Sequence, residues 1–122
     1  MKNILVIEDD DQIRALLRQI LEREGYRVSD APNGKKGIKL YRQQPADLVI
    51  TDLIMPEKEG IETIIELKRV YPEVKILAIS GGGKVNPEIY LDMAEKLGAT
   101  YAIKKPFGRG EILEAVHNLL KF

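Results

Sequence analysis

Short apolar runs alternate along this chain with longer stretches in which apolar residues recur every three or four positions. The short runs occupy residues 4–7, 26–31, 48–51, 75–79 and 101–103. The run at 48–51 predicts a strand buried on both faces of a sheet, the run at 4–7 predicts a buried strand, and the remaining runs predict further strands. The run 26–31 alternates only weakly between apolar and polar residues, which predicts a strand nearer the edge of that sheet.

Amphipathic helices are predicted between and after these strands. The first has apolar residues at helical spacing from Ile13 to Leu21, with Asp10 or Asp11 as its N-cap and Gly25 as its stop. The others are predicted at residues 36–42, 61–68, 86–97 and 112–120. Strands that alternate with helices indicate βαβ units, hence a parallel sheet with helices on both faces. We interpret residues 1–122 as one α/β domain.

Composition narrows the class of protein. The chain has 19 basic and 19 acidic residues, so no net charge favours nucleic acid or an anionic membrane. It has no cysteine, which suits a reducing compartment. Its N-terminal apolar run is too short for a signal peptide, and no run approaches the ~20 apolar residues of a membrane helix. We therefore expect a cytoplasmic protein that binds neither nucleic acid nor membrane directly.

Four of the predicted strands lead into residues capable of chemistry. Glu8 and Asp9 follow the first strand, Asp52 the third and Ser80 the fourth, and Lys105 follows the fifth. Each of them alone has an ordinary explanation, as a cap, a turn residue or a solvated charge. In a doubly wound sheet, however, these strand ends converge on one crevice, and their joint occurrence there predicts a shared site.

The charges of this set suggest what the site binds. Three carboxylates close together repel one another, and a hard divalent cation such as Mg²⁺ relieves that repulsion. With Mg²⁺ and the lysine, the formal charge sums to zero (−3 +2 +1), which leaves a pocket suited to phosphoryl oxygens. An aspartate carboxylate can act as a nucleophile toward phosphorus and form an acyl phosphate.

Four motifs together resemble the receiver domain of two-component response regulators, and the resemblance spans essentially the whole chain. They are Glu8-Asp9, the segment 51–56 (TDLIMP), the segment 78–81 (AISG) and Lys105-Pro106-Phe107. The resemblance implies a flavodoxin-like, doubly wound sheet of five parallel strands in the order 2-1-3-4-5, with five helices. It also implies a phosphoacceptor in signal transduction that is not an enzyme beyond assisting its own phosphotransfer and slow dephosphorylation.

The resemblance further implies how the metal is held. Asp9 and Asp52 match direct Mg²⁺ ligands, together with the backbone carbonyl of Ile54. Glu8 matches an outer acidic position that usually acts through water. Asp10 and Asp11 do not match positions of the family motif and are interpreted as helix-capping residues.

The phosphoryl group and its partners are implied in the same way. Asp52 matches the residue that receives the phosphoryl group from a histidine kinase or phosphotransfer protein. Ser80 matches the hydroxyl that hydrogen-bonds a phosphoryl oxygen and carries the switch, and Lys105 matches the phosphate-contacting lysine. A cis bond is implied between Lys105 and Pro106. Phosphorylation would switch a surface near the fourth and fifth helices, which is read by a protein effector or by an output domain absent from this chain.

The sequence departs from the family pattern at two places. Receivers often carry an aromatic residue where this chain has Ala102, and Tyr101 should point to the opposite face of its strand. Our hypothesis is that the glycines at 81–83 let the following loop move instead, although they also fit a plain flexible turn. Ile54 and Gly82 cannot orient an attacking water, which predicts a long-lived phosphoryl aspartate.

Three alternatives stay open at this stage. A Mg²⁺-dependent aspartyl-phosphate phosphohydrolase would commonly need a carboxylate where Ile54 stands. A flavodoxin-like cofactor binder would need a glycine-rich loop where residues 8–11 are acidic. A receiver-like scaffold that is never phosphorylated would not need an intact pocket. The chain is interpreted either as a stand-alone receiver or as a part of a longer regulator.

Overall fold

The computed structural model describes residues 2–53, 59–80, 92 and 95–121. Five strands form one parallel sheet in the order β2-β1-β3-β4-β5. The strands are β1 (Asn3–Ile7), β2 (Arg27–Ala31), β3 (Leu48–Asp52), β4 (Ile76–Ser80) and β5 (Tyr101–Lys104). This order confirms the flavodoxin-like, doubly wound fold, with β2 at an edge as its weak alternation predicted.

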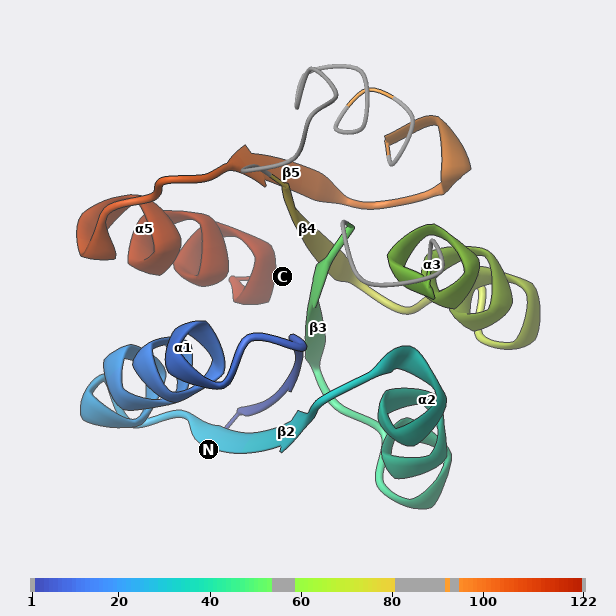
Figure 1. Cartoon of the computed structure of the whole chain (residues 1–122), viewed down its shortest axis with the longest axis horizontal. Helices are drawn as coiled ribbons and strands as arrows, with labels where there is room; N and C mark the ends of the chain where they lie inside the picture. Colours follow the sequence, from blue (N-terminus) through green and yellow to red (C-terminus); the bar gives the residue numbers. More distant parts are fainter. Residues whose placement is uncertain (1, 54–58, 81–91, 93–94, 122) are drawn as a thin grey trace.

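Helices cover both faces of the sheet (Figure 1). Helices α1 (Asp11–Arg23) and α5 (Arg109–Leu120) lie on one face, and α2 (Gly34–Gln43) and α3 (Glu59–Val70) lie on the other. Asp92 and residues 95–97 are helical, whereas the rest of the predicted fourth helix lies outside the described residues. Within the described ranges, no helix combines the length and the apolar character that a membrane span requires.

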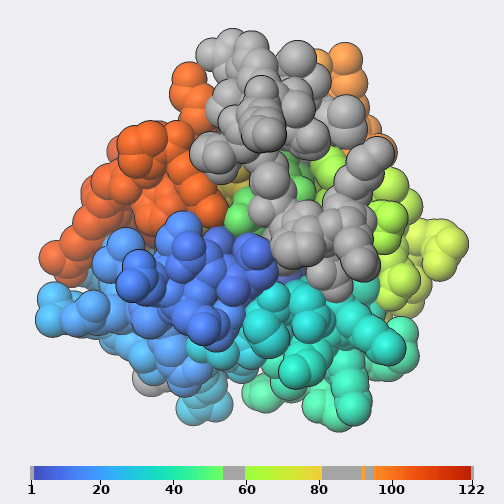
Figure 2. Space-filling model, viewed as in Figure 1, coloured from blue at the N-terminus to red at the C-terminus, as the bar shows by residue number. Residues whose placement is uncertain are grey.

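Two hydrophobic cores result, one on each face of the sheet. Every residue of β3 and β4 is buried, as the apolar run at 48–51 indicated for β3. Val6, Ile50 and Ile79 pack toward α1 and α5, whereas their neighbours in the strands pack toward α2 and α3. In the space-filling view, the N-terminal segment (blue) lies between α5 (orange-red) and α2 (teal) (Figure 2). Burial on both faces fixes how the strands are oriented and therefore where they end.

The two residues of β5 that the sequence placed on opposite faces do lie there. Ala102 packs with the α2 and α3 core. Tyr101 is half exposed and lines a shallow hollow together with Glu111, Glu114 and Leu119 of α5. The position that is often aromatic in receivers is therefore filled here by a small side chain.

Side-chain caps begin two of the helices close to the site. Asp10 accepts hydrogen bonds from the backbone N–H groups of Gln12 (2.9 Å) and Ile13 (3.1 Å), which identifies it as the N-cap of α1. Asn33 accepts from Lys36 N at 2.8 Å, so α2 begins at Gly34, two residues before the predicted start. The Asn33-Gly34 pair therefore begins a helix.

A glycine lets α3 approach the end of β3. Gly60 is the second residue of α3, and a Cβ at this position would lie 2.2 Å from the carbonyl oxygen of Asp52. It would also lie 2.6 Å from the backbone of Leu53. These are backbone atoms of a buried strand end and cannot rotate away as a flexible side chain can. The missing side chain at residue 60 therefore sets how closely α3 packs against Asp52.

We predict that Gly60→Ala destabilises the fold by about 1–3 kcal/mol, because the added methyl forces α3 away from β3. The matched control is Gly110→Ala, which is also at the second position of its helix but has nothing within 4 Å of the added carbon. That control should lie within about 1 kcal/mol of the parent protein, on the stabilising side. Urea unfolding measures both, and equal effects of the two substitutions would contradict this explanation.

Candidate functional site

The residues singled out from the sequence meet at the carboxyl-terminal edge of the sheet. Asp52 and Ser80 are the last residues of β3 and β4. Glu8 and Asp9 directly follow β1, and Lys105 directly follows β5. Neighbouring strands end nearly in register, since Ile7 is paired with Thr51, Asp52 with Ile79, and Ser80 with Lys104. One edge of the sheet thus carries all five side chains.

Three carboxylates are crowded together at this edge. One carboxylate oxygen from each of Glu8, Asp9 and Asp52 lies within 4.8 Å of the others. Glu8 is 1% exposed and Asp52 is 3% exposed, whereas Asp9 is exposed to solvent. Buried carboxylates at such separations repel one another strongly, because little water screens them.

Lys105 is the basic side chain that contacts this cluster. Its Nζ donates to Asp52 Oδ2 at 3.0 Å and to Glu8 Oε1 at 3.3 Å. The lysine side chain is itself mostly buried, so both contacts form away from bulk water. One ammonium therefore bridges two acids that lie 97 and 53 residues earlier in the chain.

The pKa values of this group follow from burial and from these contacts. Burial, followed by the negative charge of Asp52, raises the pKa of Glu8 from 4.5 to about 8, and Lys105 offsets only part of that rise. Burial by itself would lower the pKa of Lys105, but the hydrogen bond and charge of Asp52, helped by Glu8, raise it above its ordinary value. The lysine stays charged. The negative charge that it leaves uncompensated favours binding of a proton or a second cation by the cluster.

The donor set fits a hard divalent ion. Mg²⁺ takes one or two carboxylates and keeps several waters, and here two buried acids converge with an exposed one at the solvent boundary. A cation would replace the proton that the raised pKa of Glu8 favours. Ile54, whose carbonyl was assigned to the same ion, lies outside the described residues.

Ser80 contributes a buried hydroxyl without a hydrogen-bond partner at the end of β4. Its Oγ makes no hydrogen bond in the described structure, although the residue is fully buried. Its carbonyl oxygen accepts from Lys105 N at 2.7 Å, which joins the two strand ends. A buried hydroxyl with no partner is costly and is uncommon in native proteins. A ligand oxygen at this edge could supply the missing partner.

Other implied features of this edge are only partly described. The peptide bond between Lys105 and Pro106 is cis, as the resemblance implied. The glycines at 81–83, which carried our hypothesis of a moving loop, lie outside the described residues. The same holds for Ile54 and Gly82, on which the expected long phosphoryl lifetime rests.

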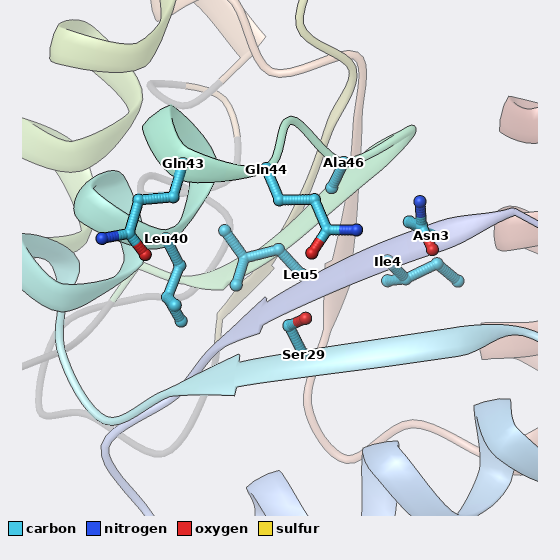
Figure 3. A pocket seen from close by; sticks show the side chains of 8 residues that line it. All are labelled: Asn3, Ile4, Leu5, Ser29, Leu40, Gln43, Gln44 and Ala46. Atoms are coloured by element: carbon cyan, nitrogen blue, oxygen red, sulfur yellow. The ribbon is translucent and has the colours of Figure 1, made fainter.

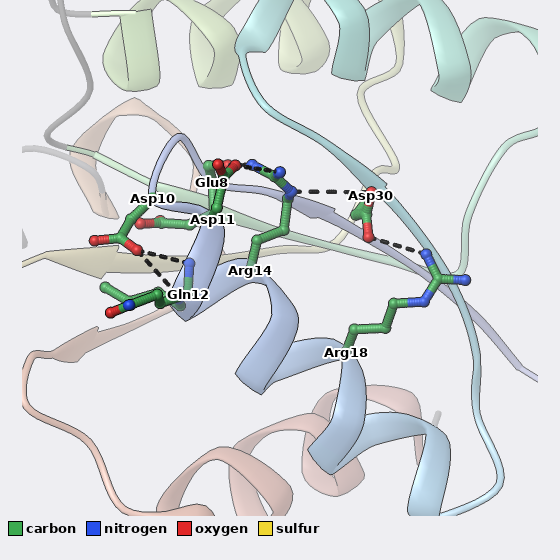
Figure 4. A network of polar contacts seen from close by, with 8 residues as sticks. Glu8, Asp10, Asp11, Gln12, Arg14, Arg18 and Asp30 are labelled. Atoms are coloured by element: carbon green, nitrogen blue, oxygen red, sulfur yellow. Dashed lines mark hydrogen bonds and ion pairs between the residues drawn. The ribbon is translucent and has the colours of Figure 1, made fainter.

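Sequence reasoning missed Arg14. Its Nη1 donates to the backbone carbonyl of Glu8 at 2.8 Å, and its guanidinium also contacts Asp11 and Asp30 (Figure 4). The Asp11–Arg14 pair at i,i+3 was visible in the sequence. A bond to a carbonyl six residues earlier depends on how α1 leaves the turn, and no periodicity predicts that.

A separate cavity of about 210 Å³ lies at the other end of β1, between β1, β2 and α2 (Figure 3). Its lining side chains are uncharged: Asn3, Ile4, Leu5, Ser29, Leu40, Gln43, Gln44 and Ala46. Because it has no cation, it does not suit a phosphoryl group. This cavity is therefore distinct from the acidic cluster at the carboxyl-terminal edge of the sheet.

Comparison with known proteins agrees with the fold and with the geometry of the edge. The family model described as the response regulator receiver domain matches residues 4–117. Chemotaxis protein CheY of Halobacterium salinarum is 33% identical over 119 residues, which span 98% of this chain and 97% of that protein. CheY of Thermotoga maritima is 32% identical over 121 residues, with 98% of each chain covered.

A solved structure is similar over nearly its whole length. The crystal structure of a response regulator receiver domain protein from Clostridium thermocellum superposes with a TM-score of 0.90 at 27% identity. The superposition covers 99% of this chain and 95% of that one. The family match and these relatives show that the chain belongs to the response regulator receiver family, whose domains accept a phosphoryl group on an aspartate in two-component signalling.

Proposed function

We propose that Asp52 is the phosphoacceptor of this receiver and takes its phosphoryl group from a histidine kinase or a phosphotransfer protein. The observation that carries the proposal is the position of its carboxylate. Asp52 is buried at the end of the central strand, 3.0 Å from the ammonium of Lys105 and beside the acids that follow β1. No other described aspartate combines burial, a lysine contact and a neighbouring acidic pair.

The transfer uses these side chains in defined roles. A carboxylate oxygen of Asp52 attacks phosphorus, and the bond between phosphorus and the donor's imidazole nitrogen breaks. The imidazole leaves with that electron pair, takes a proton from solvent, and an acyl phosphate remains on Asp52. Lys105 moves its positive charge from the carboxylate to the incoming phosphoryl oxygens, so the charge that balances Asp52 before transfer also balances the product.

Glu8, Asp9 and Asp52 would hold the Mg²⁺ ion, together with the backbone carbonyl of Ile54 outside the described residues. When bound, the ion supplies positive charge that offsets the phosphoryl oxygens. Glu8 is buried like Asp52, and its carboxylate accepts a hydrogen bond from the same Lys105 ammonium. Asp9, at the surface, is the acid through which a cation can enter.

Ser80 couples the phosphoryl group to the rest of the molecule in this proposal. Its hydroxyl would donate to a phosphoryl oxygen and thereby gain the partner that it lacks in the unmodified protein. The strand end that moves with it is tied to Lys105 by a backbone hydrogen bond. A protein effector or an output domain would bind the altered surface. Slow self-dephosphorylation would return the protein to its unmodified state. A cytoplasmic location, the usual one for this family, belongs to the same proposal.

Asp52→Asn should abolish modification by acetyl phosphate in the presence of Mg²⁺, because the amide is not a nucleophile toward phosphorus. The parent protein should acquire one phosphoryl adduct, measured by intact mass. The matched control is Asp10→Asn, which changes an exposed acid two residues from Glu8 and keeps a good N-cap. That control should be modified like the parent.

Other results of the acetyl phosphate experiment would support a different function or a different acceptor residue. Steady release of inorganic phosphate without an accumulating adduct would indicate a phosphohydrolase. Failure of the parent protein to be modified at all would support a scaffold that is never phosphorylated. Modification that survives in Asp52→Asn would move the acceptor to another residue.

Ser80→Ala should leave the unmodified protein as stable as the parent or up to about 1 kcal/mol more stable, because it removes a buried hydroxyl without a partner. Thr51→Val is the contrast: the hydroxyl of Thr51, equally buried, donates to the Asp52 carbonyl at 3.2 Å. Its removal should cost about 1 kcal/mol. The phosphoryl mimic beryllofluoride, added with Mg²⁺, should stabilise Ser80→Ala less than the parent in thermal unfolding. Equal stabilisation would remove Ser80 from the phosphoryl site.

Stability without metal should fall as pH rises from about 4.5 to about 8, because the folded protein holds a proton on Glu8 that the unfolded chain has lost. The loss should total at most about 5 kcal/mol, because each unit of pKa difference between the folded and unfolded states corresponds to about 1.4 kcal/mol. Mg²⁺, which binds the deprotonated form, should restore stability mainly at the upper end of this range. Urea unfolding in EDTA and in MgCl₂ measures both effects. Glu8→Gln should flatten the EDTA profile, and an unchanged slope in that variant would assign the pH dependence to other groups.

A further inference from the structure

The turn after β1 is rich in negative charge, and its backbone conformation must nevertheless be maintained. Residues 8–11 are four consecutive acids, and the carboxylates of Glu8 and Asp9 face Asp52. Coulomb repulsion among them tends to open the turn when no cation is bound. A separate constraint is therefore needed to keep the first two acids converged on Asp52.

Two hydrogen bonds fix the peptide groups of Glu8 from opposite sides. Its N–H donates to the carbonyl oxygen of Ala31 at 3.1 Å, which extends the β1–β2 ladder by one residue. Its carbonyl oxygen accepts from Arg14 Nη1 at 2.8 Å. The second bond reaches back from the first turn of α1, and it holds the peptide that connects Glu8 to Asp9.

Arg14 is itself held in place by its neighbours. Its side chain is only 18% exposed, its Nη2 contacts Asp11, and its Nε lies 4.0 Å from Asp30 of β2. Arg18 contacts the other oxygen of Asp30 at 2.9 Å, so Asp30 lies between the two arginines (Figure 4). A planar guanidinium with several fixed partners positions its remaining N–H groups well.

We propose that Arg14 is a positioning residue for the Mg²⁺ site: by holding the Glu8 carbonyl, it keeps Glu8 and Asp9 converged on Asp52 before the metal binds. The inference rests on the proposed metal site and names a residue outside the donor set. Arg14 acts through the backbone of the turn and contributes no metal ligand.

The direction in which the Mg²⁺ affinity changes when Arg14 is replaced distinguishes a positioning role from a purely electrostatic one. Removing a cation near a Mg²⁺ site, taken as charge alone, tightens metal binding, because one repulsive interaction is lost. Removing a positioning bond weakens metal binding, because the acids must then be gathered as the ion binds. Arg14 and Arg18 carry the same charge and share Asp30, but among the described contacts only Arg14 reaches the turn.

The experiment compares Arg14→Gln with Arg18→Gln in the full chain. Each protein is titrated with MgCl₂ at fixed ionic strength, and the backbone amide shifts of the turn and of β3 are followed by NMR. Arg14→Gln should weaken the Mg²⁺ Kd by about tenfold. Arg18→Gln should change it by less than about twofold, in the tightening direction. Unfolding in EDTA is measured alongside, so that a general loss of stability can be recognised.

The Mg²⁺ affinities of these variants decide whether Arg14 positions the metal site. An Arg14→Gln protein that binds Mg²⁺ as tightly as the parent, or more tightly, overturns the inference and leaves the metal site intact. Equal weakening in both variants also overturns it, because a shared loss of stability would then explain the data. If Arg14→Gln does not fold, Arg14→Lys decides: it keeps the charge but reaches fewer acceptors, so weaker binding supports positioning and unchanged binding rejects it. A parent protein with no Mg²⁺-dependent shifts would overturn the metal site and the inference together.

Discussion

The contact between Lys105 and the buried acids Asp52 and Glu8 is the interaction on which the site depends. Two carboxylates with almost no exposure cannot both stay ionised without a compensating charge, and the lysine supplies one within 3.3 Å of each. Burial, followed by the negative charge of Asp52, raises the pKa of Glu8 by more than Lys105 offsets, and a divalent cation would compensate the remaining negative charge of the three acids. Without a metal the site therefore carries an excess of negative charge that a divalent cation would relieve.

The fold supplies the geometry that this electrostatic arrangement requires. Parallel strands of nearly equal register end at one edge, so residues from four strands converge without any of them being close in sequence. Gly60 lets α3 sit directly against the backbone of Asp52, and the cis peptide before Pro106 follows Lys105. A backbone hydrogen bond from Lys105 N–H to the carbonyl oxygen of Ser80 also joins the ends of β4 and β5.

Around this site, the side chains that present oxygen atoms differ from the side chains that hold those residues in position. Asp9 and Asp52 bring carboxylate oxygens close together, as a cation site requires, whereas Arg14 holds the carbonyl oxygen of Glu8 and adds no oxygen to this cluster. Ser80 belongs to a third kind, a buried hydroxyl that makes no hydrogen bond in the described structure. A site built this way can be rigid in its acids and responsive in its hydroxyl, which is the division that a phosphorylation switch needs.

The sequence by itself determined the strands, their burial and the residues at their ends, because hydrophobic periodicity reports locally which side chains face a core. The weak alternation of β2 also indicated its place near an edge, whereas the structure chose Asp10 over Asp11 as the N-cap of α1. Only the tertiary structure decided that Lys105 bridges Glu8 and Asp52, that the Ser80 hydroxyl has no partner, and that Arg14 reaches the Glu8 carbonyl. Such contacts depend on register, loop geometry and burial across up to 97 residues of chain, and electrostatic energies vary with distance and solvent exposure in ways that local patterns do not encode.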